Sequence, residues 1–223
     1  MELPITSATL SDIRREGRDR GRGQRNGLTW KEVERICAVQ ETDGTLRGIR
    51  NSAILRVMSD GLLRISEVTE LRISDLEDST LRLRFSKTDQ EGSGEHLYLC
   101  EDTRKIVAEW LERSELAEGY LFRRMTSRGD NLYRDKETGE PSHLTDDGVR
   151  RIIKSCAARV ELTEKVSGHS LRIGTTISLA KSGASLVDIQ VAGRWKDPGM
   201  PAHYARAQFA EKGAIARFKD GKR

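Results

Sequence analysis

The stretch LRGIRNSAILRVMSDGLLRISE, residues 46–67, predicts a helix, the point where it ends and the first candidate functional residue. Its apolar residues recur with the spacing of an amphipathic helix. They are Leu46, Ile49, Ile54, Leu55 and Met58. We expect Gly61 to end this helix in a left-handed conformation, which glycine adopts without strain. Arg64 then lies just past a helix end, with Glu67 three residues further on.

Other segments complete a mainly helical pattern with a small sheet. Residues 29–32, Thr-Trp-Lys-Glu, have the spacing of a capping box and begin a further helix. Apolar spacing predicts helices near residues 102–114, 145–160 and 169–182. Apolar and polar residues alternate around residues 81–85 and 97–99, which predicts two antiparallel strands with one buried face. The expected fold class is mainly α with a small antiparallel β-sheet (α+β).

For two polar regions, the sequence leaves two structural interpretations open. Residues 126–143 read either as a surface hairpin or as a disordered loop. Residues 1–26 are rich in arginine and glycine, and read either as a solvated arm or as an arm that neutralises backbone phosphates.

Composition limits the class of protein. With 223 residues, 36% hydrophobic and 33% charged, the chain has room for one substantial globular domain. A net charge of +4 and a pI near 9.0 favour a polyanionic partner. No stretch approaches the length of a membrane span. The three cysteines have no metal or redox spacing, and no secretory signal is visible, so we expect reduced thiols and a cytoplasmic protein.

One ordered set of residues suits chemistry at a phosphodiester. The set is Arg64, Lys87, His169, Arg172, Trp195 and Tyr204. Guanidinium groups match the charge that builds on nonbridging phosphate oxygens, and His169 and Arg172 share a helix face. A tyrosine hydroxyl becomes a nucleophile where positive charge favours its anion, and a lysine on a hairpin can protonate a leaving oxygen. An indole N–H donates without accepting.

Each residue also has an ordinary structural explanation. Tyr204 alone would be a half-buried tyrosine, Trp195 a core residue, and Arg64 with Glu67 an exposed ion pair. Lys87 alone would be a solvated side chain. We favour a functional interpretation only because these residues occur together and in this order.

Residues 61–67, 169–172 and 193–195, with Tyr204 nine residues further on, resemble the catalytic domain of the tyrosine site-specific recombinases. The resemblance covers roughly residues 27–220. It implies a division into three parts: residues 1–26 as a basic linker or the tail of a missing core-binding domain, 27–205 as the catalytic domain, and 206–223 as a C-terminal tail helix. In relatives this last helix is exchanged between protomers, with Ile215 and Phe218 as the anchors here; the alternative is that both pack on their own domain.

The resemblance also implies the roles of single residues. Tyr204 would attack the scissile phosphate and form a 3′-phosphotyrosyl intermediate, while Arg64 and Arg172 would hold the phosphate. Lys87 would be the general acid, His169 and Trp195 would hydrogen-bond the phosphate and assist proton movement, and Glu67 would support the site from behind. Many relatives carry histidine at the Trp195 position, so tryptophan narrows the subfamily.

The implied partners are double-stranded DNA with inverted-repeat target sites and further copies of the chain in a synaptic tetramer, with no membrane. The implied place of action is the cytoplasm, at the nucleoid when the protein is bound to DNA. No cofactor and no metal ion are expected, because the phosphotyrosyl bond conserves the energy of the broken linkage and the sequence has neither a phosphate loop nor histidines in ligand spacing.

Three alternatives remain. A type IB topoisomerase uses a similar set of residues but usually has histidine at the Trp195 position. A DNA-binding protein without activity would be expected to lack one of these residues. A structural protein would need none of them.

Overall fold

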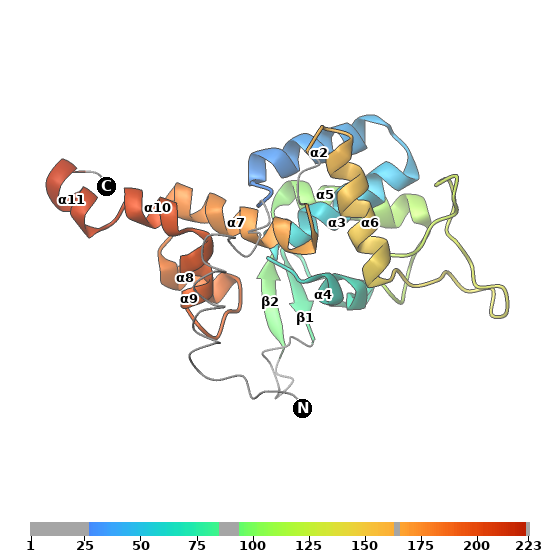
Figure 1. Cartoon of the computed structure of the whole chain (residues 1–223). Helices are drawn as coiled ribbons and strands as arrows, with labels where there is room; N and C mark the ends of the chain where they lie inside the picture. Colours follow the sequence, from blue (N-terminus) through green and yellow to red (C-terminus); the bar gives the residue numbers. More distant parts are fainter. Residues whose placement is uncertain (1–26, 85–93, 163–165, 222–223) are drawn as a thin grey trace, which may run out of the picture.

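The structure, a computed structural model, describes residues 27–84, 94–162 and 166–221. The basic segment 1–26 lies outside the described residues, and so does Lys87 in the connection between the two strands. The described part is mainly helical and contains one small antiparallel sheet, which lies at the lower edge of the molecule in Figure 1, so the expected fold class is confirmed.

The wide body of the molecule is built mainly from α2 (Trp30–Thr42), α3 (Leu46–Asp60), α5 (Glu101–Ser114) and α6 (Asp146–Ala158). α3 lies in the middle, in contact with α2, α5, α6 and α7. The sequence predicts an amphipathic helix here, but neighbours cover α3 on nearly every side, and even Asn51, Ser52 and Ser59 are buried.

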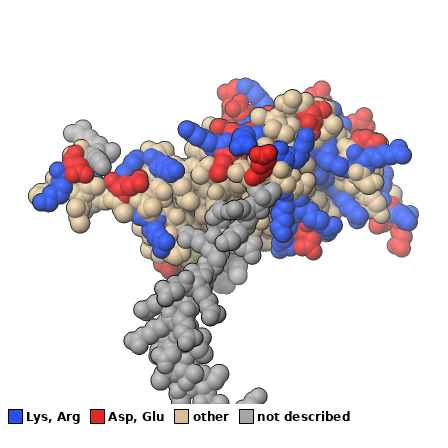
Figure 2. All heavy atoms as spheres, turned by 45° about the horizontal axis from the view of Figure 1, so that its top comes forward, with Lys and Arg blue, Asp and Glu red and all other residues tan. Residues whose placement is uncertain are grey.

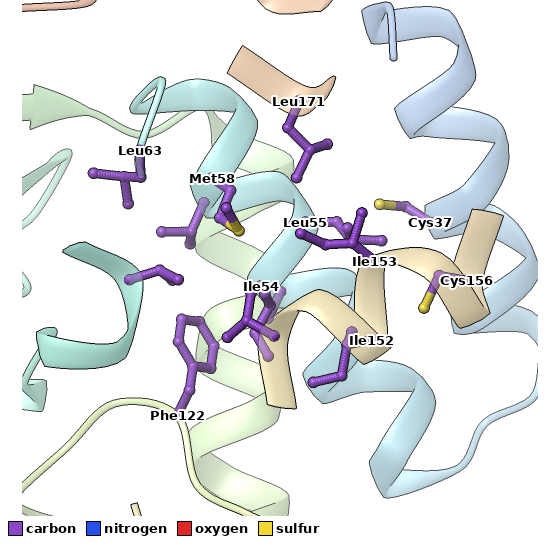
Figure 3. Packing of buried hydrophobic residues seen from close by; sticks show 14 of the residues in the cluster. Cys37, Ile54, Leu55, Met58, Leu63, Phe122, Ile152, Ile153, Cys156 and Leu171 are labelled. Carbon is purple, nitrogen blue, oxygen red and sulfur yellow. The ribbon is translucent and has the colours of Figure 1, made fainter. Parts of the chain in front are cut away.

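The main hydrophobic core lies between these helices. Figure 3 shows Leu55 of α3 beside Ile153 of α6, with Met58 of α3 in the same cluster and Phe122 at its lower left. Cys37 and Cys156 belong to the same core, and all three cysteines are free thiols, as expected.

The ends of the first helices test the local predictions. The capping box at the start of α2 is confirmed, because the Glu32 carboxylate accepts a hydrogen bond from the Thr29 backbone N–H at 2.7 Å. The prediction that α3 ends at Gly61 is confirmed, since Gly61 is its C-cap residue, but the predicted left-handed conformation of Gly61 is wrong. Gly61 has a φ of −82°, and the left-handed residue is its neighbour Leu62, with a φ of 45°. The chain turns one residue late because the Leu62 carbonyl accepts hydrogen bonds from two arginine side chains.

The sheet consists of β1 (Thr80–Leu83) and β2 (Glu95–Tyr98). The two strands are antiparallel, with Leu81 opposite Leu97 and Leu83 opposite Glu95. The leucines are buried, as the alternating pattern predicts. The short helix α4 (Ile65–Glu70) and the 3-10 turn η1 (Ile73–Asp75) precede the sheet.

Residues 122–144 form a surface hairpin, which decides between the two alternatives for this segment. The Tyr133 backbone N–H donates to the Arg124 carbonyl at 2.9 Å, and the Ser142 N–H donates to the Tyr133 carbonyl at 2.8 Å. The segment therefore folds back on itself with backbone pairing at the right of Figure 1.

The helix α7 (Gly168–Ser182) joins the body to a narrower C-terminal part (Figure 1). This part contains α8 (Leu186–Ala192), α9 (Gly199–Tyr204), α10 (Arg206–Glu211) and α11 (Ala214–Asp220). It has a hydrophobic cluster of its own around Ile189 and Ala205. The single helix predicted after residue 206 is instead two helices, because Gly213 adopts an extended conformation between them.

Candidate active site

Glu67 fixes Arg64 through hydrogen bonds to its backbone and its side chain. Arg64 is the N-cap residue of α4, and Glu67 lies in the first turn of that helix. The Glu67 carboxylate accepts from Arg64 Nη1 at 2.5 Å and from the Arg64 backbone N–H at 2.8 Å. The Glu67 side chain is 4% exposed and that of Arg64 25%, so the guanidinium reaches solvent while its partner is buried. The pair is therefore more than an exposed ion pair.

Arg172 is fixed by two carbonyls and an aromatic ring. On α7, its Nη1 donates to the Leu62 carbonyl and its Nη2 to the Gly193 carbonyl. Its Cζ atom lies 4.1 Å from the centroid of the Trp195 ring. A cation over an indole face is attracted by the ring quadrupole, so Trp195 supports the orientation of Arg172.

Positive charges gather at this point. Burial, followed by Arg64 and Arg194, lowers the pKa of Arg172 to about 9, so its guanidinium remains a cation at neutral pH. Burial raises the pKa of Glu67, but Arg194 and Arg64 outweigh burial and the net pKa lies below its ordinary value. Glu67 is therefore a carboxylate that balances part of the positive charge.

Tyr204 is the last residue of α9 and is half-buried. Its ring centroid lies 6.3 Å from that of Trp195. Burial raises the pKa of Tyr204, and the nearby charge of Arg172 opposes that shift without reversing it. The sequence argument expects positive charge to favour the phenolate. In the protein alone that effect has the expected direction but is too small, so Tyr204 is a neutral phenol.

His169 is exposed near the start of α7, one turn before Arg172. Its backbone N–H donates to the hydroxyl of the N-cap residue Ser167 at 3.3 Å. The structure brings together five of the predicted residues, and Lys87 lies outside the described part of the chain. The five are Arg64, Glu67, Arg172, Trp195 and Tyr204.

Arg194 has no role in the sequence-based prediction, although it precedes Trp195. Its side chain is 3% exposed, and its Nη2 lies 2.9 Å from Glu67 Oε2. Its Nη1 donates to the Gly61 carbonyl at 2.9 Å. Arginine is mostly exposed in proteins, and no local pattern in the sequence marks this one as buried.

In the described residues, no group of three or more His, Cys, Asp or Glu side chains is placed to hold a metal ion. In the same part of the chain, no helix is long and apolar enough to cross a membrane.

Fold and site together are typical of the catalytic domain of a tyrosine recombinase: a helical body with a two-stranded sheet, and a tyrosine beside Arg172, which has Arg64 and Arg194 near it. The model of the phage integrase family matches residues 26–211, most of the chain. The chain belongs to this family, that of the tyrosine recombinases.

Individual relatives support this family assignment. The chain is similar to the Cre recombinase of Escherichia phage P1, with 26% identity over 96% of this chain and 67% of the relative. It is similar to the tyrosine recombinase XerD of Listeria innocua, with 25% identity over 73% of this chain and 52% of the relative. The fold is similar to that of the XerH site-specific recombinase bound to palindromic difH substrate, with a TM-score of 0.67, 15% identity and coverage of 91% of this chain and 56% of that one. The chain thus spans about half to two thirds of the length of these relatives.

Proposed function

We propose that this chain cuts and rejoins DNA at specific sites through a covalent bond to Tyr204, without ATP or a metal ion. The observation that carries the proposal is a half-buried tyrosine beside the guanidinium of Arg172, which itself lies near the guanidinium of Arg64. This arrangement offers a nucleophile and a binding site for an anion in one place.

The two arginines keep donors for the scissile phosphate. A guanidinium has five N–H donors. In Arg172, one N–H of Nη1 donates to the Leu62 carbonyl and one N–H of Nη2 donates to the Gly193 carbonyl. The remaining donors address the nonbridging oxygens, while the carbonyls and the Trp195 ring fix the plane of the group. Such preorganised donors stabilise the charge that develops in the transition state.

The proposed reaction exchanges one bond for another. The Tyr204 oxygen attacks phosphorus, the bond from phosphorus to the 5′ oxygen breaks, and Lys87 protonates the leaving oxygen. His169 and Trp195 hydrogen-bond the phosphate and assist proton movement. A 5′-hydroxyl then attacks the 3′-phosphotyrosyl linkage and restores both the DNA backbone and the phenol. Since Tyr204 is a neutral phenol in the protein alone, its proton must leave as the new bond forms.

Duplex DNA with inverted repeats is the proposed partner. Figure 2 shows many Lys and Arg side chains on the wide body of the molecule, with acidic groups between them. The exposed cations include Arg150, Arg151 and Lys154 on α6. The substrate in the structurally similar XerH complex is palindromic. A protein that acts on such DNA would work where the DNA lies, and we propose the cytoplasm, at the nucleoid.

Self-association on DNA, into a synaptic tetramer, is proposed through residues 206–223. On α11, Ile215 is 79% exposed and Phe218 is 85% exposed, so neither packs on its own domain. Two large apolar side chains on a projecting helix favour a contact with another copy of the chain.

Covalent trapping tests the proposal. The protein is mixed with a pool of random duplexes that carry a nick a few bases beyond each possible scissile phosphate, so that the short 5′-hydroxyl fragment diffuses away and resealing is prevented. We expect DNA to remain attached after denaturation, and sequencing of the attached DNA to reveal an inverted-repeat motif.

Matched variants identify the nucleophile. Tyr204→Phe should abolish the adduct, while Tyr133→Phe, in the surface hairpin, should leave it unchanged. Adducts that lack a shared motif would favour the topoisomerase alternative, and adducts that persist in Tyr204→Phe would overturn the assignment of the nucleophile.

A further inference from the structure

Arg194 is buried, and its backbone has a conformation that residues other than glycine rarely adopt. Its φ is 56°, in the left-handed region, and the residue is 7% exposed. Leu62 is also left-handed, and its carbonyl accepts a hydrogen bond from Arg194 Nη2 at 3.4 Å. Strained backbone persists where the surrounding structure holds it, and it is common at functional sites. Here two such residues touch each other at the candidate active site.

Arg194 shares a partner with each of the two arginines proposed to bind the phosphate. Oε1 of Glu67 accepts from Arg64, and Oε2 of the same carboxylate accepts from Arg194 at 2.9 Å. The Leu62 carbonyl accepts from Arg172 Nη1 and from Arg194 Nη2. Arg194 therefore connects the Arg64 side of the site with the Arg172 side.

The guanidinium of Arg194 also reaches the sheet. Its Nε lies 3.6 Å from Oε2 of Glu95, the first residue of β2. Its Nη1 donates to the Gly61 carbonyl, at the end of α3. One buried side chain thus fixes the turn before α4, the start of β2 and the segment that carries Trp195 relative to one another.

We propose that Arg194 is a positioning residue: through Glu67 and the Leu62 carbonyl, it holds Arg64 and Arg172 in the one arrangement that binds the scissile phosphate. This inference rests on the proposed function. Arg194 itself does not touch the DNA. Its loss leaves both phosphate-binding arginines in place but no longer fixed relative to each other, and small misplacements of catalytic groups are costly to the rate.

The test compares Arg194→Gly with the wild-type chain in single-turnover cleavage of a nicked duplex. Glycine adopts a φ of 56° without strain, so the variant removes the side chain and keeps the backbone conformation. We expect adduct formation to slow by roughly 10- to 100-fold. The Kd for DNA should change by less than about 3-fold, because many other phosphate contacts contribute to binding.

A substrate with a methylphosphonate at the scissile position separates positioning from general structure. Replacing one nonbridging oxygen by methyl removes the negative charge that the arginines neutralise. If Arg194 acts through Arg64 and Arg172, the ratio of wild-type to Arg194→Gly rates should fall to about 3-fold or less on this substrate. The same ratio on both substrates would show a structural role and overturn the inference.

Lysine variants give a matched control. Arg194→Lys keeps a cation near Glu67 but loses the forked donors, so we expect an intermediate rate. Arg50 is also buried, at 5% exposure, and donates to the Arg123 carbonyl away from the site. Arg50→Lys should therefore leave the cleavage rate unchanged.

The outcomes also separate the two proposals. A wild-type chain without a Tyr204-dependent adduct would overturn the proposed function and this inference with it. An active wild-type chain with equally active Arg194 variants would overturn this inference alone.

Discussion

Among the single residues of the site, Glu67 carries the negative charge that balances the arginines around it. It is 5% exposed and accepts hydrogen bonds from both Arg64 and Arg194. A buried carboxylate is favourable only with such partners, and its removal leaves Arg64 without the carboxylate that it pairs with and Arg194 with only the longer contact to Glu95. The contribution of Glu67 to stability should therefore depend on its ionisation.

We predict that Glu67→Gln destabilises the protein in a pH-dependent way. The folded protein lowers the pKa of Glu67 below its ordinary value of 4.5. Its stabilising effect is then fully present above about pH 4.5 and is lost as pH falls through the lower folded pKa. Urea unfolding of both chains should show the largest difference in the free energy of unfolding near neutral pH and a smaller one in acid. A difference that stays constant across this range would contradict the assigned ion pairs.

The three thiols should differ in reactivity. Burial, as the largest effect, raises the pKa of Cys37 to about 11 and that of Cys156 to about 12, and both side chains lie in the core. Cys100 is only half-buried. At pH 8, iodoacetamide should modify Cys100 first in the folded protein, and all three thiols should react in urea, as read by mass spectrometry. Equal labelling of Cys37 and Cys100 in the folded protein would show that the core opens.

The structure of individual elements could be predicted where it depends on neighbouring residues. The capping box at Thr29 and the alternation in the two strands are local patterns, and both predictions are confirmed. The left-handed residue at the end of α3 could not be predicted, because it depends on arginines more than 100 residues away, Arg172 and Arg194. The short helices α8 and α9 were not predicted. α8 begins with a capping box between Ser185 and Asp188, a local signal that the sequence contains. α9 has no side-chain cap and contacts α7, α8 and α10, so its signal is long-range.

One close contact between elements gives a prediction for stability. The N-terminal segment crosses α7 at Gly174, where an added Cβ would lie 1.8 Å from the Leu28 carbonyl oxygen. Gly174→Ala should therefore force the segment away and lower the free energy of unfolding by roughly 1–3 kcal/mol. The control is Ser182→Ala, an exposed position on the same helix, which should change it by less than about 0.5 kcal/mol. Equal urea midpoints for Gly174→Ala and the wild-type chain would show that the crossing can shift freely.

At the scale of the whole molecule, the site is assembled from segments far apart in the chain. Arg64 precedes α4, Arg172 lies within α7, and Tyr204 ends α9. Residue types and their order were enough to predict these three as candidates. The placement of Arg172 and Tyr204 beside Trp195, and the contact of Arg194 with Glu67, could not be predicted, because long-range contacts leave no periodic pattern in the sequence.

The projecting end of the molecule gives the last prediction. Ile215 and Phe218 on α11 are exposed, so removal of residues 213–223 should leave folding and single-site cleavage intact and abolish assembly on DNA. Ile215→Ser with Phe218→Ser should have the same effect, because it removes the apolar contact while the rest of the tail remains. Light scattering of protein bound to a two-site duplex would measure assembly, and adduct formation on a single nicked site would measure cleavage. Loss of cleavage with unchanged DNA binding would show instead that the tail completes the active site of its own chain, and unchanged assembly would exclude α11 as the contact between copies.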